Sequence, residues 1–176
     1  MHICTITVKD AASFQALRLL ALRESPSSFA SSYEEERDRT LAQISAFVAG
    51  SNERVIFGAF DGNSLVGICG LGREGSLKER HRGFIRSMYV APEHRGKGIG
   101  GKLLAKACEQ AATWVGLEQL TLAVTAGNES AETLYAKHGF VPCGRVPRAL
   151  RVGGVYFDEV QMVRHTSAAS HITHAK

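Results

Sequence analysis

A glycine-rich, basic stretch near the middle of the chain has the residue types that suit an anion-binding loop. It reads Arg95, Gly96, Lys97, Gly98, Ile99, Gly100, Gly101 and Lys102, between an apolar segment and a stretch whose apolar residues have helical spacing. Glycines let the backbone approach an anion closely, and the first turn of a helix presents unpaired N–H groups with a partial positive charge. Arg95, Lys97 and Lys102 add full charges. We therefore predict that this stretch holds a phosphate or pyrophosphate group.

Two familiar phosphate-binding patterns also match the stretch, but neither has the context that it needs. Gly96, Gly98 and Gly101 satisfy GxGxxG, yet the dinucleotide motif directly follows a strand and needs an acidic residue about 20 residues further on. Here four residues separate the preceding apolar segment from Arg95, and the next apolar segment ends in TAGN without an acid. The phosphate-loop pattern GxxxxGK is followed by Leu103, so the hydroxyl that would hold magnesium is missing. Both patterns are therefore disfavoured.

A third interpretation accounts for the same residues and for a second motif. The spacing Arg95-x-x-Gly98-x-Gly100 resembles the R/Q-x-x-G-x-G/A signature of the GNAT superfamily of acyl-CoA-dependent N-acyltransferases. The run that resembles the family's second motif contains Asn128, Ala131, Leu134, Tyr135, Gly139 and Phe140. The resemblance covers roughly residues 2–163, and the segments ESPSSFASSYEEE and RALRVGGVYFDEVQMV are similar to a subgroup of small bacterial acetyltransferases.

The resemblance implies a binding mode for acetyl-CoA, the co-substrate of this family. The strand that ends at Val90 would separate from the strand over 119–124, and the pantetheine arm would pair with the backbone of Met88, Tyr89 and Val90. A backbone N–H near Met88 or Tyr89 would also polarise the thioester carbonyl and stabilise the oxyanion. The pyrophosphate would rest on the amides of residues 95–101.

Three residues of the second motif receive roles from the same resemblance. Asn128 would hold the pantetheine arm, Ala131 would pack beside it, and Tyr135 would protonate the leaving thiolate. A phenol, whose ordinary pKa is about 10, can donate a proton to a thiolate while it stays neutral at pH 7. The alternative for Tyr135 is a core tyrosine whose hydroxyl is satisfied.

The general base is the part of the site that the sequence defines least. Several proteins that this chain resembles carry a glutamate on the strand equivalent to residues 84–90, where this sequence has no carboxylate. The acceptor-side candidates are Glu34, Glu35, Asp158 and Glu159. Since Ser32 and Glu35 have capping-box spacing, the run of three glutamates is alternatively a solvated helix face. Tyr33 and Tyr156 either line the acceptor pocket or serve packing. A water relay would suit a site without a carboxylate base.

The elements that must position these groups follow from the spacing of apolar residues. The predicted strands cover 2–8, 54–60, 64–72, 84–90, 119–124, 140–151 and 155–163, and the predicted helices cover 10–24, 41–49, 98–114 and 129–138. Asp10 and Thr40 are expected to cap the first two helices. The order predicts an α/β fold with a mixed sheet of about seven strands and helices on both faces. We expect one domain over 1–164 and a flexible polar tail over 165–176.

Composition excludes several other kinds of protein. No apolar run approaches the roughly 20 residues of a membrane span, and the first residues lack the plan of a secretory signal, so we expect a cytoplasmic protein. The four cysteines are scattered and the seven histidines show no HxxxH or HExxH spacing, so we predict no metal site. The net charge of +4 comes without a basic motif interleaved with aromatic residues, which disfavours nucleic acid as a partner.

The sequence therefore predicts an N-acetyltransferase that moves an acetyl group from acetyl-CoA to a primary amine by direct attack in a ternary complex. The acceptor would be a small-molecule amine or a protein amino group, and the sequence does not identify it. The alternative is a module that senses acetyl-CoA without turnover, which the missing strand carboxylate favours and Tyr135 disfavours. A homodimer is compatible with the resemblance, because dimers are common in this family.

Overall fold

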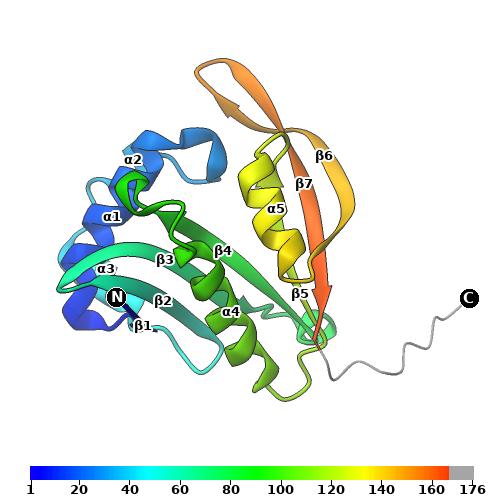
Figure 1. Cartoon of the computed structure of the whole chain (residues 1–176), viewed down its shortest axis with the longest axis horizontal. Coiled ribbons are helices and arrows are strands. Elements are labelled where there is room, and N and C mark those ends of the chain that lie inside the picture. The colour runs from blue at the N-terminus through cyan, green and yellow to red at the C-terminus, as the bar shows by residue number, and fades with distance from the viewer. Residues whose placement is uncertain (167–176) are drawn as a thin grey trace, which may run out of the picture.

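The computed structural model describes residues 1–166, which form a seven-stranded sheet in the order β1-β2-β3-β4-β5-β7-β6 (Figure 1). The strands are β1 His2–Thr5, β2 Arg54–Asp61, β3 Ser64–Arg73, β4 Arg82–Val90, β5 Gln119–Thr125, β6 Val141–Val152 and β7 Val155–His165. The helices are α1 Ala11–Glu24, α2 Tyr33–Glu36, α3 Leu41–Val48, α4 Ile99–Ala112 and α5 Glu129–Lys137. Neighbouring strands are antiparallel except β4 and β5, which are parallel. The predicted α/β class and strand number are confirmed.

The central strands are buried on both faces, which is why their sequences read as continuous apolar runs. Ile56 of β2 and Ile68 of β3 belong to the core that includes residues of α1 and α3. Their neighbours Phe57 and Cys69 belong to the core that includes residues of α4. Because successive side chains of a strand point to opposite faces, helices cover both faces of the sheet, as predicted. These two cores make β3 and β4 a firm platform for the loop that follows β4.

The two predicted helix caps differ in outcome. Thr40 and Gln43 form the expected capping box before α3: the Thr40 N–H donates to Gln43 Oε1 over 2.8 Å and the Gln43 N–H to Thr40 Oγ1 over 3.3 Å. Asp10 precedes α1, but its carboxylate turns back and accepts from the Thr7 N–H and hydroxyl, each at 2.8 Å. The carboxylate of Asp10 therefore closes the turn before α1 and does not cap the helix. The prediction of a side-chain cap by Asp10 was wrong.

The C-terminal boundary lies slightly beyond the expected residue 164. His165 is still paired in β7, and Thr166 is 4% exposed with its hydroxyl donating to the Leu117 carbonyl over 2.6 Å. The rest of the predicted tail, 167–176, lies outside the described residues. No helix within residues 1–166 has both the length and the apolar character needed to cross a membrane.

Candidate functional site

The two parallel strands at the centre of the sheet pair at only one end. Arg82, Gly83 and Phe84 of β4 face residues 119–121 of β5. Beyond this point the strands separate, while β5 stays paired with β7 as far as Thr125 (Figure 1). This separation is the one that the resemblance implied. It leaves strand edges without a partner, and they border a cavity of about 720 Å³.

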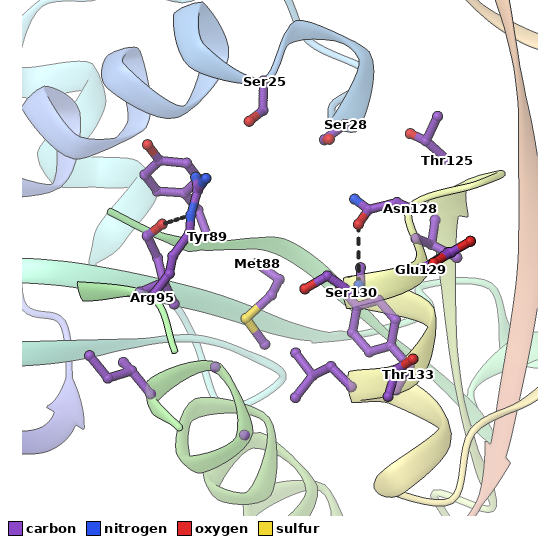
Figure 2. Close-up of a pocket in the computed structure, with 18 of the residues that line it drawn as sticks. Ser25, Ser28, Met88, Tyr89, Arg95, Thr125, Asn128, Glu129, Ser130 and Thr133 are labelled. Atoms are coloured by element: carbon purple, nitrogen blue, oxygen red, sulfur yellow. Dashed lines mark hydrogen bonds between the residues drawn. The ribbon is translucent and has the colours of Figure 1, made fainter. Parts of the chain in front are cut away.

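A β-bulge directs the end of β4 toward this cavity. Ser87 and Met88 together face the single residue Cys69 of β3, and Ser87 has a φ of +55°. A left-handed serine is uncommon and is typical of bulges and functional sites. Met88 lines the cavity below η2 (Pro26–Ser28), as Figure 2 shows. The bulge therefore exposes Met88 at the point where the strands separate.

The backbone of Val90 also faces the gap between the strands. The Ala91 N–H donates to the Val66 carbonyl over 2.9 Å, so Val90 and Gly67 form a pair that is not hydrogen-bonded. In an antiparallel ladder such a residue turns its N–H and C=O away from the partner strand, here away from β3. Arg95 Nε donates to the Val90 carbonyl over 2.9 Å, which leaves the Val90 N–H as a donor on the cavity side.

The glycine-rich stretch forms a loop and the first turn of α4, and its conformation requires glycine at two positions. Gly96 and Gly98 have φ values of +75° and +73°, where other residues are strained. The first amide bonded within the helix is that of Lys102, which donates to the Gly98 carbonyl over 3.1 Å. The amides of residues 99–101 are therefore free for a ligand, as at any helix N-terminus. Residues 98–101 line the same cavity as Met88.

The side-chain cations of the loop are arranged differently from the backbone donors. Arg95 lines the cavity, but its guanidinium binds both carboxylate oxygens of Glu24, at 2.9 and 2.6 Å. The hydrogen bonds from Arg95 lower the pKa of Glu24 to about 2. Lys97 and Lys102 are exposed and do not line the cavity. The anion-binding capacity of the loop thus rests on its backbone N–H groups, and the Glu24–Arg95 pair had no signal in the sequence.

Asn128, Ala131 and Tyr135 all line the cavity from α5. Asn128 Oδ1 accepts from the Ala131 N–H over 3.2 Å and caps the helix. Because the oxygen is used in this way, the amide NH₂ is left for a ligand, and Figure 2 shows it on the cavity side. Tyr135 is 7% exposed and its ring meets the edge of Phe140 at 6.0 Å. Burial raises the pKa of the Tyr135 phenol, so the phenol keeps its proton at pH 7.

A short turn, η2, covers the far side of the cavity. In η2, the Ser27 carbonyl accepts from the Thr125 hydroxyl over 2.6 Å, which ties the turn to the end of β5. Ser25 and Ser28 line the cavity, and Figure 2 shows both above Met88. These serines were missed because nothing local distinguishes them from other turn residues.

A second cavity of about 830 Å³ adjoins the first, since Phe29 lines both. Its walls are the end of α1, residues 30–34 and residues 149–153 of the β6–β7 hairpin. Its charged lining residues are Arg23, Glu34 and Arg151. The first cavity therefore lies beside the gap between β4 and β5 and the free amides of residues 99–101. The second cavity meets the first at Phe29.

Comparison with known proteins agrees with this geometry. Residues 15–140 match the model of the acetyltransferase (GNAT) family. The chain belongs to that family. It is 32% identical over 118 residues to GCN5-related N-acetyltransferase 7 of Arabidopsis thaliana, covering 65% of this chain and 41% of the relative. It is 33% identical over 82 residues to spermidine N(1)-acetyltransferase of Vibrio cholerae, covering 47% of each. The chain thus spans less than half the length of these curated relatives.

Solved GNAT structures cover the chain more completely. The GNAT acetyltransferase of Streptococcus pneumoniae has a TM-score of 0.82 and 27% identity, covering 93% of this chain and 98% of that one. A phosphinothricin acetyltransferase of Sinorhizobium meliloti, solved with acetyl-CoA, has a TM-score of 0.83 at 17% identity, covering 99% of this chain and 93% of that one. The second likeness shows the shared fold alone.

The carboxylates considered as general bases in this GNAT chain lie outside the first cavity. Glu34 lines the second cavity. Glu35 accepts from the Ser32 N–H over 2.6 Å and is the capping-box residue that the alternative interpretation expected. Asp158 accepts from the Arg148 N–H and from Arg145, each at 2.9 Å, which lowers its pKa.

Two further acceptor-side candidates, Tyr156 and Glu159, line neither cavity. Among the described residues that line the first cavity, Glu129 is the one carboxylate, and the sequence analysis passed over it beside Asn128. No group of His, Cys, Asp and Glu within residues 1–166 has the arrangement of a metal site.

Glu36, the last of the three consecutive glutamates, is buried rather than solvated. It is 4% exposed and accepts from Arg18 Nη2 and Nε at 2.9 and 3.1 Å. Burial by itself would raise the pKa of Glu36, but the hydrogen bonds and charge of Arg18 outweigh it and the pKa is lowered. The Arg18 guanidinium also lies 4.8 Å from the ring of Phe29. This ion pair joins α1 to α2, both of which contribute to the wall of the second cavity, so the solvated-face interpretation was wrong for Glu36.

Proposed function

We propose that this chain transfers the acetyl group of acetyl-CoA to a primary amine in a ternary complex. The observation that carries the proposal is the strand gap. Beyond Phe84, β4 and β5 are unpaired, and the free Val90 N–H and the amides of residues 99–101 line one cavity. An extended amide-bearing arm such as pantetheine can replace the missing strand partner, and a pyrophosphate suits the free amides of a helix N-terminus.

The remaining groups around the cavity fit the chemistry of acyl transfer. The amine would attack the thioester carbonyl near Met88, and a backbone N–H of β4 would stabilise the oxyanion that forms. Collapse of the tetrahedral intermediate breaks the C–S bond, and Tyr135 would give its proton to the departing thiolate. The buried position of its ring beside the cavity supports this role for Tyr135.

The proton of the attacking amine needs a separate route. No residue of β4 is a carboxylate, so we propose a relay of water molecules supported by the hydroxyls of Ser25 and Ser28. Such a relay can deliver the proton to bulk water or return it to the phenolate of Tyr135. Asn128, through its free amide NH₂, would bind the pantetheine arm.

Named relatives support an amine as the acceptor. The Vibrio cholerae protein is a spermidine acetyltransferase, and the bovine relative, 43% identical over 56 residues, is a thialysine acetyltransferase. Both names describe transfer to an amino group. The Sinorhizobium meliloti structure with acetyl-CoA is consistent with the coenzyme proposed here.

The test is release of free CoA thiol from acetyl-CoA in the presence of a panel of amines. Saturable release that depends on the amine, with a mass increase of one acetyl group on it, is the expected result. Saturable calorimetric binding of acetyl-CoA without release for any amine would instead identify a sensor. Absence of binding would remove the proposal altogether.

A further inference from the structure

The second cavity contains more positive than negative charge, although the acceptors named for relatives include a polyamine. Two arginines and one glutamate line it: Arg23 from the last turn of α1, Glu34 from α2, and Arg151 from β6. Spermidine carries only positive charges, so it would meet two like charges for each opposite one. Like charges that face each other across a binding surface reject a ligand. The lining therefore argues against a polyamine acceptor.

Within residues 1–166, neither Arg23 nor Arg151 forms an ion pair. Other arginines around the site differ: Arg18 pairs with Glu36, Arg95 with Glu24, and Arg145 with Asp158. An unpaired arginine at a cavity wall keeps its N–H donors for a ligand, and its planar fork suits a carboxylate or a similar anion.

Aromatic rings hold both of these guanidinium groups. The Arg23 guanidinium lies 5.3 Å from the centre of the Tyr33 ring, and that of Arg151 lies 5.4 Å from the Tyr156 ring. Contact with a ring face restrains the guanidinium plane and leaves its edge donors unoccupied. Tyr33 lines the cavity and Tyr156 does not, so Tyr156 contacts Arg151 from outside the lining. Each exposed guanidinium therefore has an aromatic partner in the absence of a ligand.

We propose that the acceptor is an amine that carries a carboxylate or an equally compact anionic group, bound by Arg23 and Arg151. This inference rests on the proposed acetyl transfer. The amino group of the acceptor passes Phe29, which lines both cavities, to reach Met88, while its anionic group stays in the second cavity. Glu34 bears the one negative charge of the lining and suits a second amino group or a hydrogen-bond donor of the same acceptor.

The first test measures kcat/KM by thiol release for three kinds of acceptor. These are the common α-amino acids, the α-amide of each, and spermidine. The amide is the more easily deprotonated amine, so intrinsic reactivity favours the amide. We expect the reverse, with the best amino acid at least about tenfold above its amide and above spermidine, which is a typical discrimination for a hydrogen-bonded charge.

Variants then assign the preference to the two arginines. Arg23→Gln and Arg151→Gln should each raise KM for the carboxylate acceptor about tenfold and remove its advantage over the amide, with acetyl-CoA affinity unchanged. Arg148→Gln is the matched control, because Arg148 also lies on β6, contacts the Tyr156 ring at 4.9 Å and does not line the cavity. Arg148→Gln should change neither the KM for the carboxylate acceptor nor its advantage over the amide.

The outcomes separate this inference from the function on which it rests. Turnover that favours the amides or spermidine, or an unchanged carboxylate KM in both arginine variants, overturns the inference and leaves acetyl transfer standing. If acetyl-CoA binds but neither these acceptors nor any amine of the general panel releases thiol, the proposed function fails and the inference fails with it.

Discussion

The two cavities on either side of Phe29 are built from different parts of the polypeptide. The first is lined mainly by two continuous stretches, 88–101 and 123–137, with free amides at Val90 and 99–101, and is completed by Ser25, Ser28 and Phe29. The second presents mainly side chains of segments far apart in the chain, 22–34 and 149–153. Free backbone amides do not depend on the identity of the side chains around them, whereas a site formed by side chains does. Under the proposed function, the second cavity, with Arg23, Glu34 and Arg151 in its lining, would select the acceptor.

The largest expected effect concerns the Arg18–Glu36 ion pair, which joins α1 to α2 in the wall of the second cavity. Glu36→Ala leaves the buried Arg18 without its carboxylate, and breaking a buried pair in this way costs about 3–5 kcal/mol. Urea unfolding measures this loss. A double variant, Arg18→Met with Glu36→Leu, should recover most of it, because apolar replacement of both partners is close to neutral. If Glu36→Ala is as stable as the native chain, the Arg18–Glu36 pair does not stabilise the packing of α1 against α2.

The next effect concerns chemistry in the first cavity. Tyr135→Phe should lower kcat about 100-fold, the lower range for loss of a general acid, while calorimetry shows unchanged affinity for acetyl-CoA. Because burial raises the pKa of Tyr135, kcat of the native chain should not fall through loss of this proton between pH 7 and about 10. Equal turnover by the two proteins would reduce Tyr135 to a core residue.

A glycine pair tests whether the first cavity depends on the backbone conformation of its loop. Gly98→Ala should weaken acetyl-CoA binding about tenfold, since a left-handed alanine costs roughly 1–2 kcal/mol and the loop would relax away from its binding geometry. Gly116→Ala is the control, because Gly116 has the same φ of +73° and equally open surroundings. Gly116 lies in the connection between α4 and β5, away from the first cavity. Both variants should lose similar stability, and only Gly98→Ala should lose affinity.

The smallest effect concerns the residue that joins the two regions. Glu24, next to Arg23, binds Arg95 of the glycine-rich loop. Because both side chains are partly exposed, the pair should contribute about 1 kcal/mol at pH 7. The folded-state pKa of about 2 lies below the ordinary 4.5, so this contribution is present above pH 4.5 and is lost as the pH falls toward 2.

Urea unfolding of the native chain and of Glu24→Gln should therefore differ at pH 7 and converge near pH 2–3. Glu109→Gln in the exposed Lys106–Glu109 pair should differ little from the native chain at either pH. A gap between the native chain and Glu24→Gln that stays constant down to pH 2 would show that Glu24 is not held by Arg95.

Local chemistry explains which parts of the molecule the sequence predicted. The Thr40 cap depends on a few neighbouring residues, and its position was predicted from their spacing. The left-handed glycines 96 and 98 and the Asn128 cap are equally local features, although only the glycine-rich loop and a helix from residue 129 were predicted there. The order of elements predicted helices on both faces of the sheet, and the continuous apolar runs of β2 and β3 agree with burial on both faces.

What could not be predicted depends on contacts between distant segments. Nothing near Arg95 or Glu36 in the sequence shows that each finds an opposite charge on α1. The assembly of Arg23 with Arg151 in one cavity depends on how the β6–β7 hairpin lies beside α2, which no local pattern encodes. The three consecutive glutamates 34–36 show this limit clearly. Glu34 lines a cavity, Glu35 caps a helix and Glu36 forms a buried ion pair, although the three residues are identical and adjacent.

The strand gap as the coenzyme site can be tested most directly by amide hydrogen exchange with and without saturating CoA. We predict slower exchange at Val90 and at residues 99–101 when CoA is bound, with little change over 149–153. If calorimetry shows CoA bound while the Val90 amide exchanges at its original rate, the coenzyme does not pair with β4 and the account of the first cavity is wrong.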